Sequence, residues 1–203
     1  MFDACRGRVL ACFFVFFTMA LSAAAGPKES LEAYFGKTFY LKYNLFVSGF
    51  DADWKNELGE PDFIPIATKV KVSKVKSDAV YLDVEGKKRP IKLDLDDVTP
   101  DAQTFLGRLL GSEPPSLEGL STVDSSGIKA AAVTKGMSRR AVFLAVGYPP
   151  YYFTPHIPFA PMVRKVCANR SPDDAPELTY LQSDRDFVRV TLANDIVVAV
   201  DRD

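Results

Sequence analysis

The chain has 203 residues, of which 47% are hydrophobic and 25% are charged, so it carries enough apolar surface to form a folded core. This composition excludes a collagen-like repeat, a coiled-coil rod and wholesale disorder. The 25 basic and 26 acidic residues give a formal net charge of −1, so no overall field attracts nucleic acid or anionic lipid, and we expect no nucleic-acid partner.

The first 25 residues have the organisation of a secretory signal peptide. Arg6 and Arg8 precede an apolar run, and small residues follow it. Ala23 and Ala25 stand at the two positions that signal peptidase requires to be small, which predicts cleavage after Ala25. We therefore expect a periplasmic or secreted protein with no transmembrane span after cleavage. The alternative is that the run, which reaches 18 residues when counted through Gly26, is retained as a membrane anchor.

Cleavage at this position removes two of the three cysteines, Cys5 and Cys12, and leaves Cys167 alone. A single cysteine forms no internal disulfide, so the mature chain is not a disulfide scaffold. Cys12 precedes the hydrophobic core of the signal instead of following it, which argues against lipid attachment there. The formal net charge of the mature chain becomes −2, because Asp3, Arg6 and Arg8 are lost.

Residues 36–98 alternate between apolar and polar side chains with a period of two, which is typical of strands that have one buried face. Turn residues separate several of the runs, for example Glu85 and Gly86. The pattern predicts four or five short antiparallel strands in a small all-β domain, for which an SH3-like barrel is the leading architecture. The alternating runs lie at residues 39–45, 70–76, 80–84 and 91–95.

Two features of this β domain are candidates for binding. Trp54, the only Trp, lies in a long segment between the first two runs, and it is either a ligand contact or, with Phe50, a cap on the end of the core. A row of lysines on the second run either meets an anionic polymer such as cell wall or protects a sheet edge. These lysines are Lys69, Lys71, Lys74 and Lys76.

After Val98 the spacing of apolar residues changes from a period of two to a helical period. We therefore place the domain boundary there and assign residues 99–203 to a second, α+β domain. Thr99 and Pro100 are suited to begin a helix that continues through Leu110. Ser116 is suited to begin a weaker second helix, in which two glycines reduce helix propensity.

Residues 136–150 contain the clearest helix start and stop signals in the chain. Ser138 is placed to cap a short helix, Gly147 to end it, and Pro149 prevents its continuation. The segment resembles the Gly-Met-Ser/Thr-x-x-x-Val-x-x-x-x-Gly-x-Pro signature of BamE/SmpA-OmlA-like envelope domains, which share a fold with β-lactamase inhibitor proteins. The resemblance implies two helices packed on a three-stranded antiparallel sheet and an envelope setting, and it covers about residues 116–203. The strands are expected at residues 178–181, 187–192 and 196–200, with a tight turn at Asn194 and Asp195.

The segment 151–177 is longer than the resemblance implies and is rich in aromatic residues and proline. Proline restrains the backbone, so an exposed aromatic segment of this kind would lose little entropy on binding a partner. The alternative is that it packs between the domains. The candidate partner-binding residues are Tyr148, Tyr151, Tyr152, Phe153, Phe159 and Trp54.

Three functional hypotheses follow. The leading one is a non-catalytic cell-envelope protein that acts as a protein-binding or envelope-assembly module, with an envelope protein as its partner. The second is a cell-wall (peptidoglycan) ligand-binding protein that uses the β domain. The third is a cysteine hydrolase using Cys167 and His156, which lacks any sign of a helix N-terminus to activate the thiol. With one His and one mature Cys we expect neither a metal site nor a cofactor.

Overall fold

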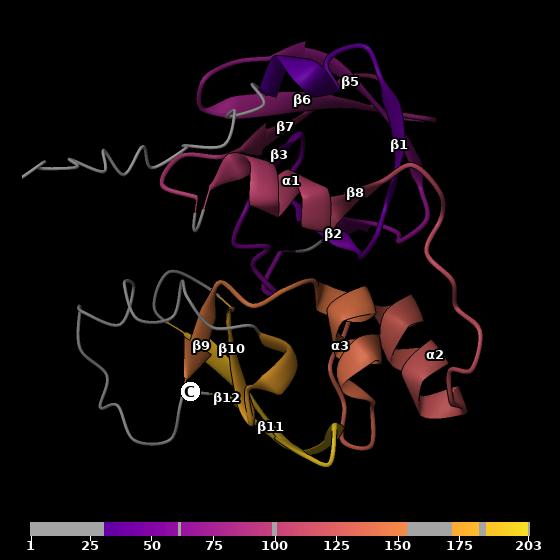
Figure 1. Cartoon of the computed structure of the whole chain (residues 1–203), viewed down its shortest axis with the longest axis vertical. Helices are drawn as coiled ribbons and strands as arrows, with labels where there is room; N and C mark the ends of the chain where they lie inside the picture. The colour runs from indigo at the N-terminus through magenta and orange to yellow at the C-terminus, as the bar shows by residue number, and fades with distance from the viewer. Residues whose placement is uncertain (1–30, 61, 99–100, 154–171, 183–185, 203) are drawn as a thin grey trace, which may run out of the picture.

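The computed structural model describes residues 31–60, 62–98, 101–153, 172–182 and 186–202. The fold is mixed α+β, and two units are stacked along the long axis of the molecule (Figure 1). Within the described ranges, no helix combines the length and the apolar character needed to cross a membrane.

The first unit consists of two sheets that are mostly antiparallel, a short 3-10 helix and one α-helix. The larger sheet has the order β3-β7-β6-β5-β1-β8, and the smaller one pairs β2 with β4. All pairs are antiparallel except β3 with β7, which is parallel. The elements are η1 (Leu31–Tyr34), β1 (Thr38–Leu41), β2 (Leu45–Val47), β3 (Asp51–Asp53), β4 (Asp62–Ile64), β5 (Lys69–Val75), β6 (Ala79–Val84), β7 (Ile91–Asp94), α1 (Ala102–Leu109) and β8 (Leu110–Gly111).

This unit has more strands than the four or five predicted, and one pair is not antiparallel. The run at residues 39–45 is two strands, because the backbone between them leaves the sheet. There the Lys42 N–H donates to the Leu109 carbonyl at 2.8 Å and the Asn44 N–H donates to the Leu144 carbonyl at 3.3 Å. The segment predicted as one long loop contains β3, whose three residues are too few to show a period.

The alternating residues of these strands form one core, and α1 packs into it. Phe105, Leu106 and Leu109 of α1 lie in the same buried cluster as the strand residues. The helix is capped by Asp101, whose side chain accepts a hydrogen bond from the Thr104 N–H, rather than by Thr99. The change from a period of two to a helical period after Val98 predicts this helix as part of the second domain. The helix packs with the first core instead, because its apolar residues belong to that buried cluster.

Three lysines of the row, Lys69, Lys71 and Lys74, lie on β5, which pairs with β6 on one side and β1 on the other, and Lys76 directly follows the strand. All four lysines are exposed. Edge protection therefore does not explain them, since β5 is an interior strand.

The second unit packs two helices on a four-stranded antiparallel sheet of order β12-β11-β10-β9. Three strands were predicted, and the fourth is β9, which pairs with β10 and begins the segment predicted as an insert. Its three residues precede the proline-rich stretch and are too few to show a period. The elements are α2 (Thr122–Ala130), α3 (Arg139–Val146), β9 (Tyr151–Phe153), η2 (Pro172–Asp174), β10 (Glu177–Leu181), β11 (Phe187–Ala193) and β12 (Ile196–Arg202).

Most of the helix ends and turns predicted for the second unit are confirmed. The Ser138 side chain caps α3 by accepting a hydrogen bond from the Ala141 N–H, and Gly147 ends the helix at a φ of 81°. Asn194 and Asp195 both have positive φ in the turn between β11 and β12. However, α2 begins after Ser121 instead of Ser116, because Gly119 has a φ of 75°, which no right-handed helix accommodates.

Candidate functional site

The two units are joined at the C-terminal end of α3. The last four carbonyls of a helix have no partner within it, so they need donors from elsewhere. Here Phe143 O accepts from the Gly147 N–H at 2.9 Å, and Leu144 O accepts from the Asn44 N–H at 3.3 Å. The remaining two carbonyls accept from asparagine side chains of the first unit, as the next paragraph describes. The first unit therefore completes three of the four helix-end hydrogen bonds.

Two buried asparagines, Asn44 and Asn56, supply these bonds and are 1% and 3% exposed. Asn44 Nδ2 donates to Ala145 O at 2.9 Å and to Ile128 O at 2.8 Å, so it reaches the last turns of both α3 and α2. Asn56 Nδ2 donates to Val146 O at 2.9 Å. Buried amides that are hydrogen-bonded in this way hold one arrangement of the two units, because any slippage leaves polar groups unpaired.

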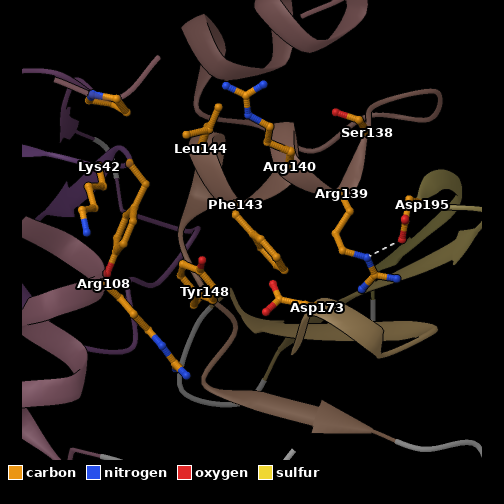
Figure 2. Close-up of a pocket in the computed structure, with 12 residues that line it drawn as sticks. Lys42, Arg108, Ser138, Arg139, Arg140, Phe143, Leu144, Tyr148, Asp173 and Asp195 are labelled. Atoms are coloured by element: carbon orange, nitrogen blue, oxygen red, sulfur yellow. Dashed lines mark hydrogen bonds and ion pairs between the residues drawn. The ribbon is translucent and has the colours of Figure 1, made fainter. Parts of the chain in front are cut away.

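A groove of about 560 Å³ lies beside this junction and receives residues from both units (Figure 2). The size is within the range of ligand pockets. Its lining contains four cationic and two anionic side chains together with aromatic and apolar groups. The lining residues are Lys42, Tyr43, Arg108, Pro115, Ser138, Arg139, Arg140, Phe143, Leu144, Tyr148, Asp173 and Asp195.

The floor of the groove is an aromatic stack. The rings of Phe143 and Tyr148 lie 4.6 Å apart between centroids with an interplanar angle of 18°. The guanidinium carbon of Arg108, from α1, lies 5.0 Å from the centroid of the Tyr148 ring. The Tyr148 ring thus contacts both a phenyl ring and a planar cation, which fixes its position in the groove.

Tyr43 lies behind this stack and is 2% exposed. Burial is the main effect on its phenol and raises the pKa far above the ordinary value, with the Tyr148 phenol adding to this and the Arg108 cation partly opposing it. Tyr43 is therefore neutral at any physiological pH and does not act as a base. Its ring packs so closely on Gly147 that a Cβ there would lie 2.7 Å from the ring edge.

Arg139 and Arg140 tie together segments around the groove. Arg139 Nε forms an ion pair of 2.7 Å with Asp195, and its Nη1 donates to Ala175 O at 2.7 Å. Arg140 donates to the carbonyls of Ser116 and Glu118, which ties the segment before α2 to α3. Figure 2 shows Arg139 directed toward Asp195 and Lys42 and Arg108 on the opposite wall.

Two of the predicted partner-binding residues, Tyr148 and Trp54, lie in different parts of the structure. Tyr148 is half-buried and lies in the groove. Trp54 packs in the first core at 7% exposure, and its Nε1 donates to Asp96 O at 2.9 Å, as the core-cap alternative predicted for it, whereas Phe50, the other residue of that alternative, is 39% exposed.

The remaining predicted residues lie in or beside the proline-rich stretch. The backbone of Tyr151, Tyr152 and Phe153 forms β9 and pairs with β10. Phe159, His156 and Cys167 lie outside the described residues, so the cysteine-hydrolase hypothesis stays a prediction.

Sequence reasoning missed Lys42, Arg108 and Phe143 as groove residues. In the sequence, Lys42 is only a polar member of an alternating run, and Arg108 lies on the polar face of a helix. No local signal brings them together, because they are 66 residues apart in the chain and meet only when α1 packs beside β1. The helical period of residues 139–146 did contain a hint, since it predicts a core face of Ala141, Val142, Ala145 and Val146, and Phe143 lies outside that set.

A second hollow, of about 360 Å³, lies at the β3–β7 end of the first unit and is lined by five carboxylates and Lys92. Lys92 donates to Asp94 at 2.8 Å, and this hydrogen bond is the main cause that lowers the pKa of Asp94. Across the described ranges, no group of three or more His, Cys, Asp or Glu side chains has the arrangement to hold a metal ion.

Comparison with family models, with curated proteins and with solved structures found no match for this chain.

Proposed function

We propose that this protein is an exported, non-catalytic module of the cell envelope that binds a segment of another protein in the groove between its two units. The observation that carries the proposal is the groove itself, which has an aromatic floor and charged walls. It is held in shape by buried amides instead of by a flexible hinge. A preformed site of this kind loses little entropy when a ligand binds.

Residue chemistry in the groove supports binding over catalysis. The hydroxyl of Ser138 is engaged as the cap of α3, and the phenol of Tyr43 is held neutral. The Ser138 hydroxyl accepts from the Ala141 N–H at 3.2 Å and also hydrogen-bonds the Asp124 carboxylate, so it is held at the start of α3.

The envelope setting rests on the signal-like residues 1–25 and on the resemblance of residues 136–150 to BamE-like domains. On this proposal the first unit is an SH3-like barrel and the second a BamE-like domain with one added strand. The partner is an envelope protein, and the working location is the periplasm or the outside of the cell.

Photocrosslinking at the groove tests the proposal. We expect p-benzoylphenylalanine in place of Leu144, a half-buried lining residue, to yield an adduct of defined mass in intact cells. The same group in place of Val123, which is exposed on α2 and does not line the groove, is the matched control. Equal labelling at the two positions, or none at residue 144, would refute the proposal.

A second candidate function, binding of cell-wall polymer by the β unit, is favoured by the exposed lysines on and directly after the interior strand β5. Lys74 on the strand and Lys76 just after it lie 5.2 and 5.7 Å from the centroid of the Tyr81 ring. Sedimentation of the protein with purified peptidoglycan, compared with a variant that carries Gln at all four lysines, decides this candidate. Equal sedimentation of the two proteins would exclude it.

A further inference from the structure

The lysine row of the first unit lies on one face of the sheet although its spacing is irregular. Its second and third members, Lys71 and Lys74, are three residues apart, and regular alternation would place them on opposite faces. However, the pairing of β5 with β6 shifts register between them, and Ser73 is the extra residue of this bulge. Lys71 pairs with Asp83 of β6. Lys74 pairs with Tyr81, two residues earlier on β6, so both lysines point to the same side.

The two ends of the row lie on this face as well. Lys69 is two residues before Lys71, and a buried valine separates them. Lys76 directly follows β5, and its Nζ lies 5.7 Å from the centroid of the Tyr81 ring. The Nζ of Lys74 lies 5.2 Å from the same centroid. The four exposed ammonium groups therefore form a line that extends for about 20 Å along the strand.

The row is a line of separate cations bordered by acids. None of its four ammonium groups forms an ion pair with any residue that the structure describes. Three carboxylates border the row: Asp83 on β6, Asp78 between β5 and β6, and Glu85 directly after β6. The Ser73 hydroxyl donates to Asp83 at 2.8 Å. The row therefore alternates with acids and is not a continuous basic patch.

Hydroxyl groups also border the row. Thr38 and Tyr40 of β1 pair with two of the lysines, and Tyr81 of β6 pairs with a third. On β7, Lys92 is opposite Tyr81 and forms an ion pair of 2.8 Å with Asp94, so this pair adds no net charge. Hydroxyls and carboxylates both form hydrogen bonds with the hydroxyl groups of a ligand. The border thus suits a ligand that is rich in hydroxyls and carries spaced negative charges.

We propose that the lysine row binds a linear anionic polysaccharide, in which successive sugars carry negatively charged groups. This inference rests on the second candidate function and specifies its ligand, and it does not depend on the groove. The anionic groups meet the ammonium groups along β5, because charge-assisted hydrogen bonds to lysine are the strong ones. The sugar hydroxyls meet the bordering hydroxyls and carboxylates.

Two other polyanions fit this surface less well. Nucleic acid is densely charged, so the three bordering carboxylates would repel it. A layer of anionic lipid is flat, so it would match cations spread over an area better than cations in a single line. A polysaccharide has the hydroxyls and the spaced charges that the row and its border complement.

Polygalacturonate, which has one carboxylate on each sugar, tests the inference with the purified chain. Its methyl ester has the same backbone without the charges and is the matched ligand control. We expect fluorescence anisotropy of dye-labelled eight-sugar oligomers to show at least about tenfold tighter binding of the acid than of the ester. Two-sugar oligomers should bind more weakly than eight-sugar ones, because they reach only part of the row. The preference for the acid should shrink as salt is raised, because exposed charges are screened.

Variants assign the binding to the row. The double variant Lys74→Gln/Lys76→Gln should weaken binding of the eight-sugar acid by about tenfold. Lys87→Gln/Lys88→Gln removes the same charge from exposed positions between β6 and β7, outside the row, and is the matched control. It should change the affinity by less than about twofold, because screening limits the effect of distant charges. Equal losses in the two double variants would show that net charge decides binding, which would overturn the inference.

Competition experiments supply the remaining outcomes. Tighter binding of a single-stranded DNA 12-mer, or of vesicles of anionic lipid, than of the eight-sugar acid would overturn the inference. A failure of the acid to bind would overturn it as well. In that case sedimentation with peptidoglycan that still depends on the four lysines would preserve the second candidate function, so the two failures are distinguishable.

Discussion

Gly147 has a backbone conformation that other residues adopt only with strain. Its φ of 81° and ψ of −172° lie in a region that is essentially restricted to glycine. The Tyr43 ring occupies the space where a side chain would go, and the Tyr180 hydroxyl donates to the Gly147 carbonyl at 3.2 Å. This one residue therefore ends α3, seats the ring of Tyr43 and directs Tyr148 into the groove.

Gly147→Ala should lower the free energy of unfolding by about 3 kcal/mol, because backbone strain and overlap with Tyr43 act together. Gly86→Ala is a matched control, since Gly86 has a φ of 80° but no atoms within 4 Å of the place where a Cβ would lie. It should cost only about 1 kcal/mol. Urea unfolding curves of the two variants measure the difference, and equal losses would show that contact with Tyr43 contributes nothing.

At the scale of elements, the N-terminal ends of α2 and α3 share one carboxylate. Asp124 accepts from the Ser121 N–H at 3.0 Å, which completes a capping box, and from the Ser138 N–H at 2.7 Å. Burial opposes ionisation of Asp124, but these backbone hydrogen bonds outweigh it and hold the pKa of the carboxyl below its usual value. The helix pair is thus fixed at its start by a side chain and at its end by the asparagines.

The lowered pKa of Asp124 predicts a loss of stability in acid. A carboxyl whose folded pKa lies below its unfolded value of about 3.9 stabilises the fold above that value. This contribution is lost as the pH falls through the folded pKa. We expect the free energy of unfolding to decrease from about pH 5 to about pH 3, and Asp124→Asn to be less stable at pH 5 and to show a shallower decrease.

Denaturant titrations across this pH range provide the measurement. Asp94, whose pKa is also lowered, contributes a decrease of the same sign in both proteins, so the difference between their slopes isolates Asp124. Parallel curves for the two proteins would contradict the assignment.

At the scale of the whole molecule, the second unit depends on the first to complete its helices. Three of the last four α3 carbonyls accept from Asn44 or Asn56, and Phe46 of β2 packs in the core of the second unit. The Leu58 N–H also donates to Leu181 O at 2.9 Å, which links the loop before β4 to the end of β10. Separating the units would leave these groups without partners, so we expect the molecule to unfold as one cooperative system.

Asn44→Ala should lower the free energy of unfolding by about 3 kcal/mol, because the Ile66 N–H and the Ala145 carbonyl lose their buried partner. Trp54 fluorescence reports on the first core, and far-UV circular dichroism reports on all the helices. The two signals should change at the same urea concentration in the unmodified protein. Ser126→Ala, at an exposed position of α2, should change stability by less than about 0.5 kcal/mol. Separate transitions for the two signals would contradict the coupling.

Local chemistry was sufficient to predict several elements of this fold. The period of two located the strand runs of the first unit, and Ser138 and Gly147 marked the ends of α3. The turn at Asn194 and Asp195 also followed from residue type. Each of these features is decided by interactions within a few residues, so each is visible in the sequence. Strands of two or three residues, such as β3, β8 and β9, show no period and were missed for that reason.

The sequence alone therefore determined the α+β character, the alternation of the sheets and the boundaries of α3, because hydrophobic period and cap chemistry act locally. Only the tertiary structure decided that α1 packs with the first core and that asparagines of one unit complete the helices of the other. It also decided that Lys42, Arg108 and Tyr148 meet in one groove. Such contacts join residues tens of positions apart, and they arise from the packing of whole surfaces, which no short segment encodes.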